Sequence, residues 1–327
     1  MRPASPLSST FPLYSTGMTT TGAGPRSFHL PGYEVAVGPF THVAAERDRL
    51  ASLRWRAFDA RQLGATVGAE ISGLDLGTDL PDEVIAELRR ALHDYKVIFF
   101  RGQRLTPRQH VAFARRFGDL EVHPFLASNT GEPELVRFEK TAEVSGYENS
   151  WHHDVTWREC PSMGAILHAI DVPDHGGDTL FSDMYAAYDA LDEATRDEIA
   201  GLHAVHDFIQ TFGHTMTAEE RLAAQERYPP VRHPVVCRHP ATGRRHLYVN
   251  RPFVSNIDGL DPEESRPLLD RLCRQADAPE HQCRFTWSKD AVAFWDNRAV
   301  QHYASSDYWP QRRTMERASV VGSRPVR

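Results

Sequence analysis

The chain has 327 residues, of which 41% are hydrophobic and 25% are charged, a balance typical of globular proteins and not of disordered or fibrous ones. Its net charge is −7, and basic residues are interspersed with acidic ones, which argues against nucleic acid as the main partner. No apolar run approaches the roughly 18 residues that a membrane-spanning helix needs, so an integral membrane role is excluded.

The N-terminal region has the composition of a tail. Sixteen of the first 26 residues are Ser, Thr, Pro or Gly, and no apolar segment follows that could serve as a secretory signal. We therefore expect a disordered or loosely ordered extension over residues 1–56 and one domain over residues 57–327. The four cysteines form no CxxC pair or dense framework, so we expect reduced thiols and a cytoplasmic location.

The first periodic elements are helical. Apolar residues between Pro81 and Tyr95 recur on one helical face, and Val97 to Phe100 reads as a short buried strand. Thr106 followed by Pro107 predicts the start of a second helix, which Gly118 closes.

From Met163 onward the pattern changes to short β-rich runs separated by Pro and Gly. The expected strands are 165–170, 179–181, 246–254, 284–287, 291–295 and 314–321. Many short strands with early helices packed outside predict a mainly β, α+β fold, a double-stranded β-helix (jelly roll) with flanking helices. The polar, partly helical segment 203–233 is expected to be a lid insertion over one mouth of this core.

The segment from Trp151 to Thr156 contains the most informative residues. If it is a strand, His152 and Asp154 point to the same face and can bind one ion together. His302 is the best third ligand, and two His with one carboxylate are typical of non-haem Fe(II) oxygenases. Taken alone, the pattern also fits surface or core histidines.

A second group of residues lies near the C-terminus. Arg313, Met315 and Arg317 would share one face of a late strand, on the metal side of the core. Buried guanidinium groups are costly unless anions meet them, and their planar donors suit carboxylate or sulfonate groups. The alternative is that each arginine pairs with a structural carboxylate.

Several separated motifs together resemble one enzyme family. Over residues 58–325 the chain is similar to the TauD/TfdA family of Fe(II)- and 2-oxoglutarate-dependent dioxygenases. The motifs are WHHDVTW from Trp151, GGDTLF from Gly176, HDFIQTF from His206, WDNRAVQHYA from Trp295 and DYWPQRRTMER from Asp307.

The resemblance implies a role for particular residues. It makes His152, Asp154 and His302 the ligands of Fe(II), and it makes Thr179 and Arg313 the clamp on the distal carboxylate of 2-oxoglutarate, the cosubstrate used with O2. Arg313 follows His302 by eleven residues, as the family pattern requires.

The same resemblance implies a substrate site. Its residues would be His123 and Arg317, which hold a sulfonate in taurine-acting members, and the aromatic walls Phe212 and Phe253. Leu126 and Glu148 depart from those members, which have Tyr and Asn near the amine end of the ligand. Glu148 could attract a cationic amine or could simply be solvated.

The function that the resemblance implies is hydroxylation of a small anionic substrate. A sulfonate such as taurine would give an aldehyde and sulfite, with succinate and CO2. The alternatives are the same chemistry on an alkyl sulfate, an aryloxyalkanoate or an amino acid of a specialised pathway. More remote are a metal-dependent hydrolase and a non-catalytic anion-binding barrel. Oligomeric state is left open, although the family includes homo-oligomers.

Overall fold

The computed structural model describes residues 28, 30, 35, 37–123, 128, 131–146 and 148–327. Most of the predicted N-terminal extension lies outside these residues, and so does Leu126.

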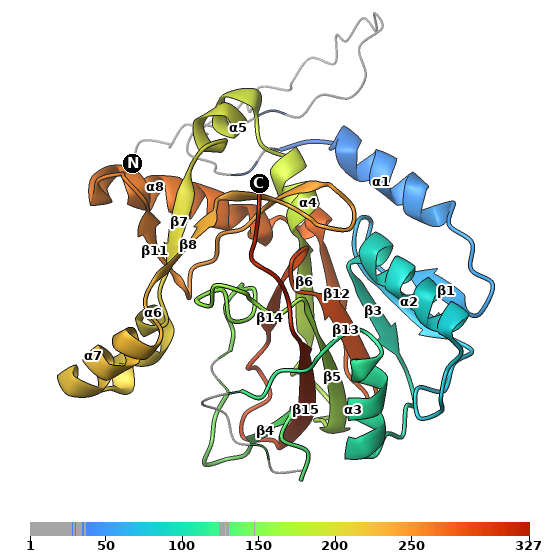
Figure 1. Cartoon of the computed structure of the whole chain (residues 1–327). Coiled ribbons are helices and arrows are strands. Elements are labelled where there is room, and N and C mark those ends of the chain that lie inside the picture. Colours follow the sequence, from blue (N-terminus) through green and yellow to red (C-terminus); the bar gives the residue numbers. More distant parts are fainter. Residues whose placement is uncertain are drawn as a thin grey trace, which may run out of the picture.

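The centre of the molecule is a seven-stranded sheet in which one pair of neighbours, β2 and β3, is parallel (Figure 1). In spatial order the strands are β1 (Asp59–Gln62), β2 (Ala69–Ser72), β3 (Val97–Phe100), β13 (Val292–Asp296), β5 (Gly164–Asp171), β15 (Arg313–Val320) and β4 (Leu135–Lys140). Every residue of β3 and β13 is buried. Strands covered on both faces are continuous apolar runs, which is why the sequence predicts them well.

A smaller sheet packs against the inner face of the large one. It consists of β12 (Gln282–Phe285), β6 (Thr179–Asp183) and β14 (Val300–Ala304). Aromatic side chains of both sheets fill the space between them, and the rings of Phe99 and Phe285 stack with centroids 4.0 Å apart. Within the described residues no strand ladder joins the two sheets into a closed barrel.

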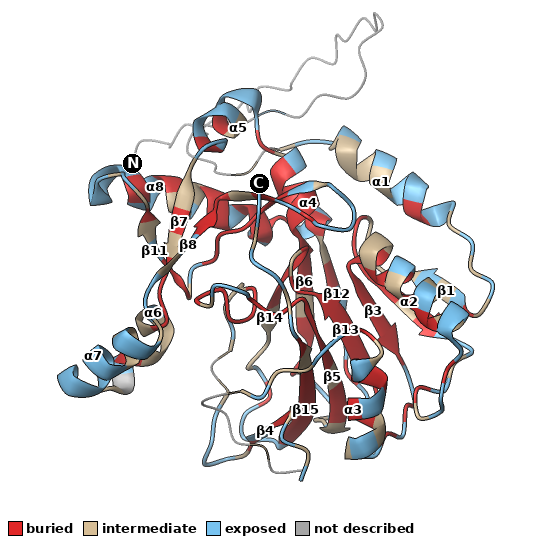
Figure 2. Cartoon of the chain, viewed as in Figure 1, coloured by how far each residue is buried: buried red, intermediate tan, exposed pale blue. Residues whose placement is uncertain are grey.

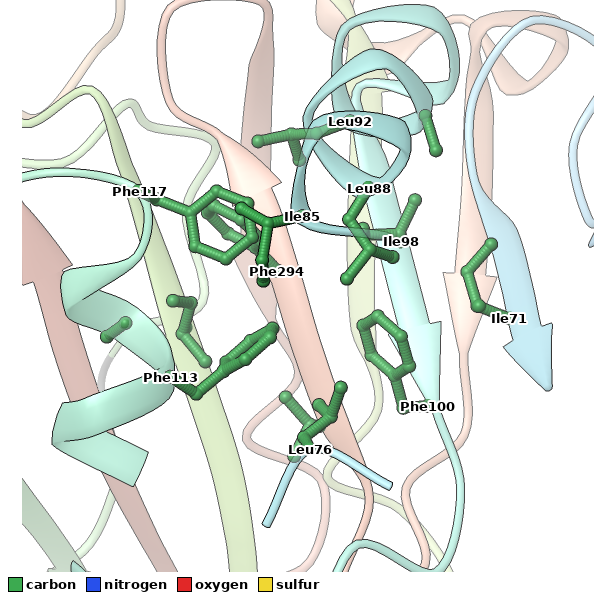
Figure 3. Packing of buried hydrophobic residues seen from close by; sticks show 14 of the residues in the cluster. Ile71, Leu76, Ile85, Leu88, Leu92, Ile98, Phe100, Phe113, Phe117 and Phe294 are labelled. Atoms are coloured by element: carbon green, nitrogen blue, oxygen red, sulfur yellow. The ribbon is translucent and has the colours of Figure 1, made fainter. Parts of the chain in front are cut away.

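Two helices cover the outer face of the large sheet. They are α2 (Asp82–Tyr95), which confirms the prediction from apolar spacing, and α3 (Pro107–Arg115), which confirms the prediction from Thr106 and Pro107. Figure 3 shows their apolar side chains packed on those of the sheet. Thr106 caps α3, because its hydroxyl accepts from the Gln109 backbone while the Gln109 side chain accepts from the Thr106 backbone.

Regular secondary structure is present before residue 57. Helix α1 (Thr41–Ala51) lies within the predicted extension, and its Leu50 is buried. Glu46 of α1 reaches Lys96, whose fully buried ammonium group lies 2.5 Å from Glu46 and 3.2 Å from Asp183. A buried cation needs such partners, so this cluster anchors α1 to both sheets.

The remaining elements lie at the top and along the left side of the molecule in Figure 1. They are α4 (Met184–Asp189), α5 (Glu193–Ile199), β7 (His203–His206), α6 (Ile209–Phe212), η1 (Gly213–Thr215), α7 (Ala218–Arg227), β8 (Val231–Pro234), β9 (Val236–Arg238), β10 (Arg245–Leu247), β11 (Val254–Ile257), α8 (Pro262–Cys273), η2 (Arg274–Asp277) and η3 (Pro279–His281). Strands β11, β7 and β8 form a three-stranded sheet, and β10 pairs with β9. Figure 2 shows that α7 is exposed along its length. The segment predicted as a lid is therefore two strands of this sheet with helices between them.

One predicted strand is wrong in its extent. The run 246–254 is divided, because β10 ends at Leu247 and β11 begins at Val254. The side chain of Asn250 accepts a hydrogen bond from the Phe253 backbone across a turn that contains Pro252. Proline has no amide hydrogen to donate to a ladder, which disfavours a continuous strand through Pro252.

Among the described residues, no helix is both long enough and apolar enough to cross a membrane.

Candidate active site

Three side chains from distant parts of the sequence meet at one edge of the small sheet. His152, Asp154 and His302 each offer one ligand atom, and these atoms lie within 4.8 Å of one another. His302 is on β14, and the backbones of His152 and His302 exchange two hydrogen bonds of 3.1 and 2.9 Å. The predicted convergence of these residues is therefore present.

The local structure around Asp154 differs from the predicted strand. His152 forms only an isolated β-bridge, and a turn begins at Asp154. Val155 has a φ of 48°, a conformation that is costly for a β-branched residue. The turn, and not the pleat of a strand, directs the Asp154 carboxylate toward the two imidazoles. His153 points elsewhere, where it is buried against Tyr248 with ring centroids 4.7 Å apart.

The three ligand atoms have the chemistry that a divalent metal needs. The Nδ1–H of His152 donates to the Ser150 carbonyl at 2.8 Å, which leaves Nε2 with a lone pair. Oδ1 of Asp154 accepts from Nη1 of Arg317 at 2.8 Å, whereas Oδ2 is buried without a hydrogen-bond partner, 3.9 Å from Nε2 of His302. A buried carboxylate oxygen with no donor is expensive, and a metal ion would satisfy it.

Burial and neighbouring charges favour the ligand forms of these groups. Burial lowers the pKa of His302 to about 3, so the imidazole is neutral at neutral pH. For Asp154, burial opposes ionisation, but Arg317 and the two imidazoles outweigh it and hold the pKa below its ordinary value. Neutral imidazole and ionised carboxylate are the forms that bind metal.

Asn297 is a functional residue that the sequence interpretation did not assign. Its side chain is fully buried, accepts from the Asp154 backbone N–H at 2.7 Å and donates to the Asp154 carbonyl at 3.0 Å. It also donates to the Ser162 carbonyl. Asn297 thus fixes the backbone of Asp154, the residue at which the strained turn begins. The only signal in the sequence is its place in the motif that begins at Trp295, five residues before His302.

Asn297→Ala should loosen the metal ligands without removing one. Three buried backbone groups would lose their partners, so we expect a loss of about 1–3 kcal/mol in the free energy of unfolding and about 10- to 100-fold weaker metal binding. Denaturant unfolding of the metal-free protein and a metal competition titration measure the two effects. Asn256→Ala, at a partly buried asparagine on β11, is the control. Unchanged metal affinity in Asn297→Ala would contradict the positioning role.

The predicted cosubstrate residues lie next to the candidate metal ligands. Thr179 and Arg313 line a cavity of about 80 Å³ together with His152 and His302. The hydroxyl oxygen of Thr179 accepts from the Trp287 indole at 2.9 Å, which orients it. The cavity can therefore hold a small molecule between a cation and the metal position.

Arg313 carries a buried charge that the described residues do not neutralise. Its side chain is largely buried, none of the ion pairs among the described residues includes it, and Nε and Nη2 have no hydrogen-bond partner. Burial lowers its pKa, although the Tyr308 hydroxyl and more distant carboxylates counteract this. The alternative that Arg313 pairs with a structural carboxylate is thus absent here, and the site is suited to an incoming anion.

The predicted substrate residues line a second, adjoining cavity. It has a volume of about 280 Å³ and shares His152 and Arg317 with the first. The other predicted residues on its wall are His123, Glu148, Phe212 and Phe253. Burial and the Arg317 charge lower the pKa of His123 to about 4, so the ring is neutral at neutral pH. Arg317 keeps Nε without a partner while Nη1 holds Asp154.

Glu148 has a partner that the sequence interpretation did not include. Nζ of Lys140 lies 2.7 Å from its carboxylate, so Glu148 is not simply solvated, and its attraction of a cationic amine stays a prediction. Lys140 and Glu148 line both cavities. Lys140 was not predicted, and no signal in the sequence connects it with Glu148, because they meet only through the position of β4. Leu126, the other departure, lies outside the described residues.

The sequence and the fold have clear relatives. The family model described as "Taurine catabolism dioxygenase TauD, TfdA family" matches residues 59–319. An alpha-ketoglutarate-dependent sulfate ester dioxygenase of Pseudomonas putida is 34% identical over 82% of this chain and 91% of its own. A (S)-phenoxypropionate/alpha-ketoglutarate-dioxygenase of Sphingobium herbicidovorans is 35% identical over 81% and 96%.

Solved structures agree with this assignment. A crystal structure of a taurine dioxygenase from Burkholderia xenovorans superimposes with a TM-score of 0.72 and 35% identity, covering 83% of this chain and 93% of the other. The chain belongs to the TauD/TfdA family and is an enzyme of the 2-oxoglutarate-dependent dioxygenase type.

Proposed function

We propose that the protein is an Fe(II)- and 2-oxoglutarate-dependent dioxygenase that hydroxylates a small organic anion. The observation that carries this proposal is the buried, uncompensated Arg313 in the same cavity as His152 and His302. A metal-dependent hydrolase has no use for such an anchor, whereas a keto diacid needs a cation at a fixed distance from the metal.

We assign one task to each group of residues. His152, Asp154 and His302 would hold Fe(II), since two imidazoles and a carboxylate leave coordination positions open. Bound there, ferrous iron supplies O2 activation coupled to decarboxylation of 2-oxoglutarate to succinate and CO2. Arg313 and Thr179 bind the distal carboxylate of the cosubstrate, which gives it a single orientation.

The primary substrate would occupy the larger cavity. Nε of Arg317 and a neutral His123 offer donors to an anionic group, and Phe212 and Phe253 provide apolar walls that exclude water. An arginine binds sulfonate, sulfate and carboxylate alike. We propose a sulfonate such as taurine first, with alkyl sulfates, aryloxyalkanoates and amino acids of a specialised pathway as alternatives.

We also propose the fold class, the lid segment and the location of the protein. The two facing sheets correspond to a jelly-roll core, and segment 203–233 to a lid, since it contributes Phe212 to the substrate cavity. A cytoplasmic location is supported by four free thiols, of which three are buried.

The proposal is tested by two measurements on the metal-free protein. Anaerobic addition of Fe(II) and 2-oxoglutarate should give a metal-to-ligand absorption band that neither compound gives alone. Succinate release is then compared for taurine, an alkyl sulfate and a phenoxypropionate. If the phenoxypropionate is turned over and taurine is not, the substrate is a carboxylate and not a sulfonate. If the absorption band is absent and the protein hydrolyses a substrate with Zn²⁺, the enzyme is a hydrolase and not a dioxygenase.

Arg317→Ala should mainly impair use of the primary substrate. Loss of a buried charge-assisted contact costs about 2 kcal/mol or more, which corresponds to at least about a 30-fold higher KM. Decarboxylation of 2-oxoglutarate without hydroxylation should persist at saturating Fe(II). Parallel assays of succinate and product measure this uncoupling, with the exposed neighbour Arg312→Ala as control. An unchanged substrate KM would show that Arg317 serves Asp154 alone.

Lys140→Met should change the preference for substrates that carry an amine. The Lys140 ammonium compensates Glu148, so its removal leaves a more negative wall that attracts a cationic amine. We expect the ratio of kcat/KM for taurine to that for an uncharged-tail sulfonate to rise about 3- to 10-fold. In Lys140→Met/Glu148→Gln the ratio should return toward that of the wild type. If the ratio stays constant in both variants, Lys140 and Glu148 do not contact the amine end of the substrate.

A further inference from the structure

A second group of metal-ligating side chains lies on the other face of the large sheet. His110, His168 and Glu316 are all buried and place one ligand atom each within 4.8 Å of one another. We propose that these residues form a second divalent-metal site, suited to Zn²⁺, which joins α3 to the outer face of the sheet.

Strand register brings two of the three residues together. Glu316 on β15 is the direct cross-strand neighbour of His168 on β5, and Arg137 on β4 is the next residue in the same row. Opposed side chains in a sheet lie within contact distance. Glu316 and Arg317 are adjacent on one strand and point to opposite faces, so the second site is separate from the cavities around Arg317.

Helix α3 supplies the third residue from above the sheet. His110 lies on the buried face of α3 with Val111, Phe113 and Ala114. Figure 3 shows Phe113 of this helix pointing into the packing between helix and sheet. The rings of His110 and His168 are perpendicular, with centroids 5.9 Å apart. The cluster is thus enclosed by a helix and three strands.

The rings of His110 and His168 contain buried nitrogens without a hydrogen-bond partner of ordinary geometry among the described residues. Nε2 of His110 donates to the Ile166 carbonyl at 3.1 Å, so its Nδ1 carries the lone pair, and this atom has no partner. The Gln103 backbone lies near the His168 ring, but neither ring nitrogen makes a hydrogen bond of ordinary geometry with the described residues. Each unsatisfied buried polar atom costs about 1–3 kcal/mol. A metal ion would satisfy Nδ1 of His110 and one ring nitrogen of His168 at the same time.

The set of donors indicates the class of ion. Two imidazoles with one carboxylate are a zinc-binding combination. Nη1 of Arg137 holds one Glu316 oxygen at 3.0 Å, as a carboxylate ligand is commonly oriented by a second residue. Ligands 2.0–2.2 Å from Zn²⁺ in a tetrahedron lie about 3.5 Å apart, so the side chains must close by about an ångström around the ion.

The test counts Zn²⁺ on the chelator-stripped full chain, in competition with a zinc chelator that removes weakly bound surface ions. We expect the cluster of His152, Asp154 and His302 to bind Zn²⁺ as well, so His302→Ala provides a background in which only the second site remains. The wild type should retain two ions, His302→Ala one, and His302→Ala/His168→Gln none. His302→Ala/Thr314→Val, changed at a buried neighbour on β15, should still retain one.

Thermal unfolding with and without Zn²⁺ supplies an independent readout. Zn²⁺ should raise the Tm of His302→Ala but not that of His302→Ala/His168→Gln, because an ion that joins α3 to the sheet binds only the folded chain. If His302→Ala does not fold, Glu316→Gln in the otherwise wild-type chain should lower the count from two to one.

Either of two results would overturn the proposal. One is a folded His302→Ala variant that retains no ion. The other is an equal number of retained Zn²⁺ ions in His302→Ala and in His302→Ala/His168→Gln. The cluster would then be a polar network completed by water. Both measurements omit 2-oxoglutarate and O2, so their outcome is independent of the proposed function.

Discussion

Asp154→Ala is expected to abolish metal retention and turnover together. The substitution removes one of the three proposed ligands, whose donor atoms lie within 4.8 Å of one another. Changing a residue that only orients a ligand typically costs 10- to 100-fold in metal affinity, so loss of a ligand itself should exceed about 100-fold. Competition titration with Fe(II) under anaerobic conditions and a succinate assay measure the two losses.

A stability measurement separates the two roles of Asp154. In the metal-free protein the carboxylate also neutralises Arg317, and breaking a buried ion pair from one side costs about 3–5 kcal/mol. Asp154→Ala should therefore lower the free energy of unfolding in the presence of a chelator. Asp154→Ala/Arg317→Met should recover much of that stability but no metal binding. If the double variant regained metal binding, Asp154 would be a partner of Arg317 and not a ligand.

Elements with strong periodicity were predictable from sequence. Helix α2 has its apolar residues at helical spacing, and α3 begins with a threonine cap followed by proline, so local propensity and burial agree. The central strands are buried on both sides and are apolar throughout. In these segments a short window of sequence contains the forces that determine the structure.

The site was predictable only in part, because much of it depends on contacts between distant residues. The strand predicted around His152 is wrong, since Asn297, more than a hundred residues later, holds Asp154 in a turn. The same applies to Lys140 beside Glu148 and to Glu316 opposite His168, which depend on strand register. Register is a property of the whole sheet and is not visible in any one strand.

Arg313→Met should raise the KM for 2-oxoglutarate on the order of 10²–10³-fold, because a buried charge-assisted contact is worth about 2–5 kcal/mol. In the ligand-free protein, the same substitution is expected to be favourable, because it should raise the free energy of unfolding. The guanidinium is largely buried, and two of its nitrogens have no partner. Replacing this buried charge by an apolar side chain of similar volume should therefore stabilise the ligand-free protein, by about 1–4 kcal/mol.

Steady-state kinetics and denaturant unfolding test the two effects of Arg313→Met, with Met315→Leu in the same cavity as control. A residue with a purely structural role would lose stability on substitution, so a destabilised Arg313→Met with an unchanged KM would refute the anchor. Together, the higher KM and the greater stability would show that the folded protein tolerates an unfavourable buried cation in order to bind an anion there.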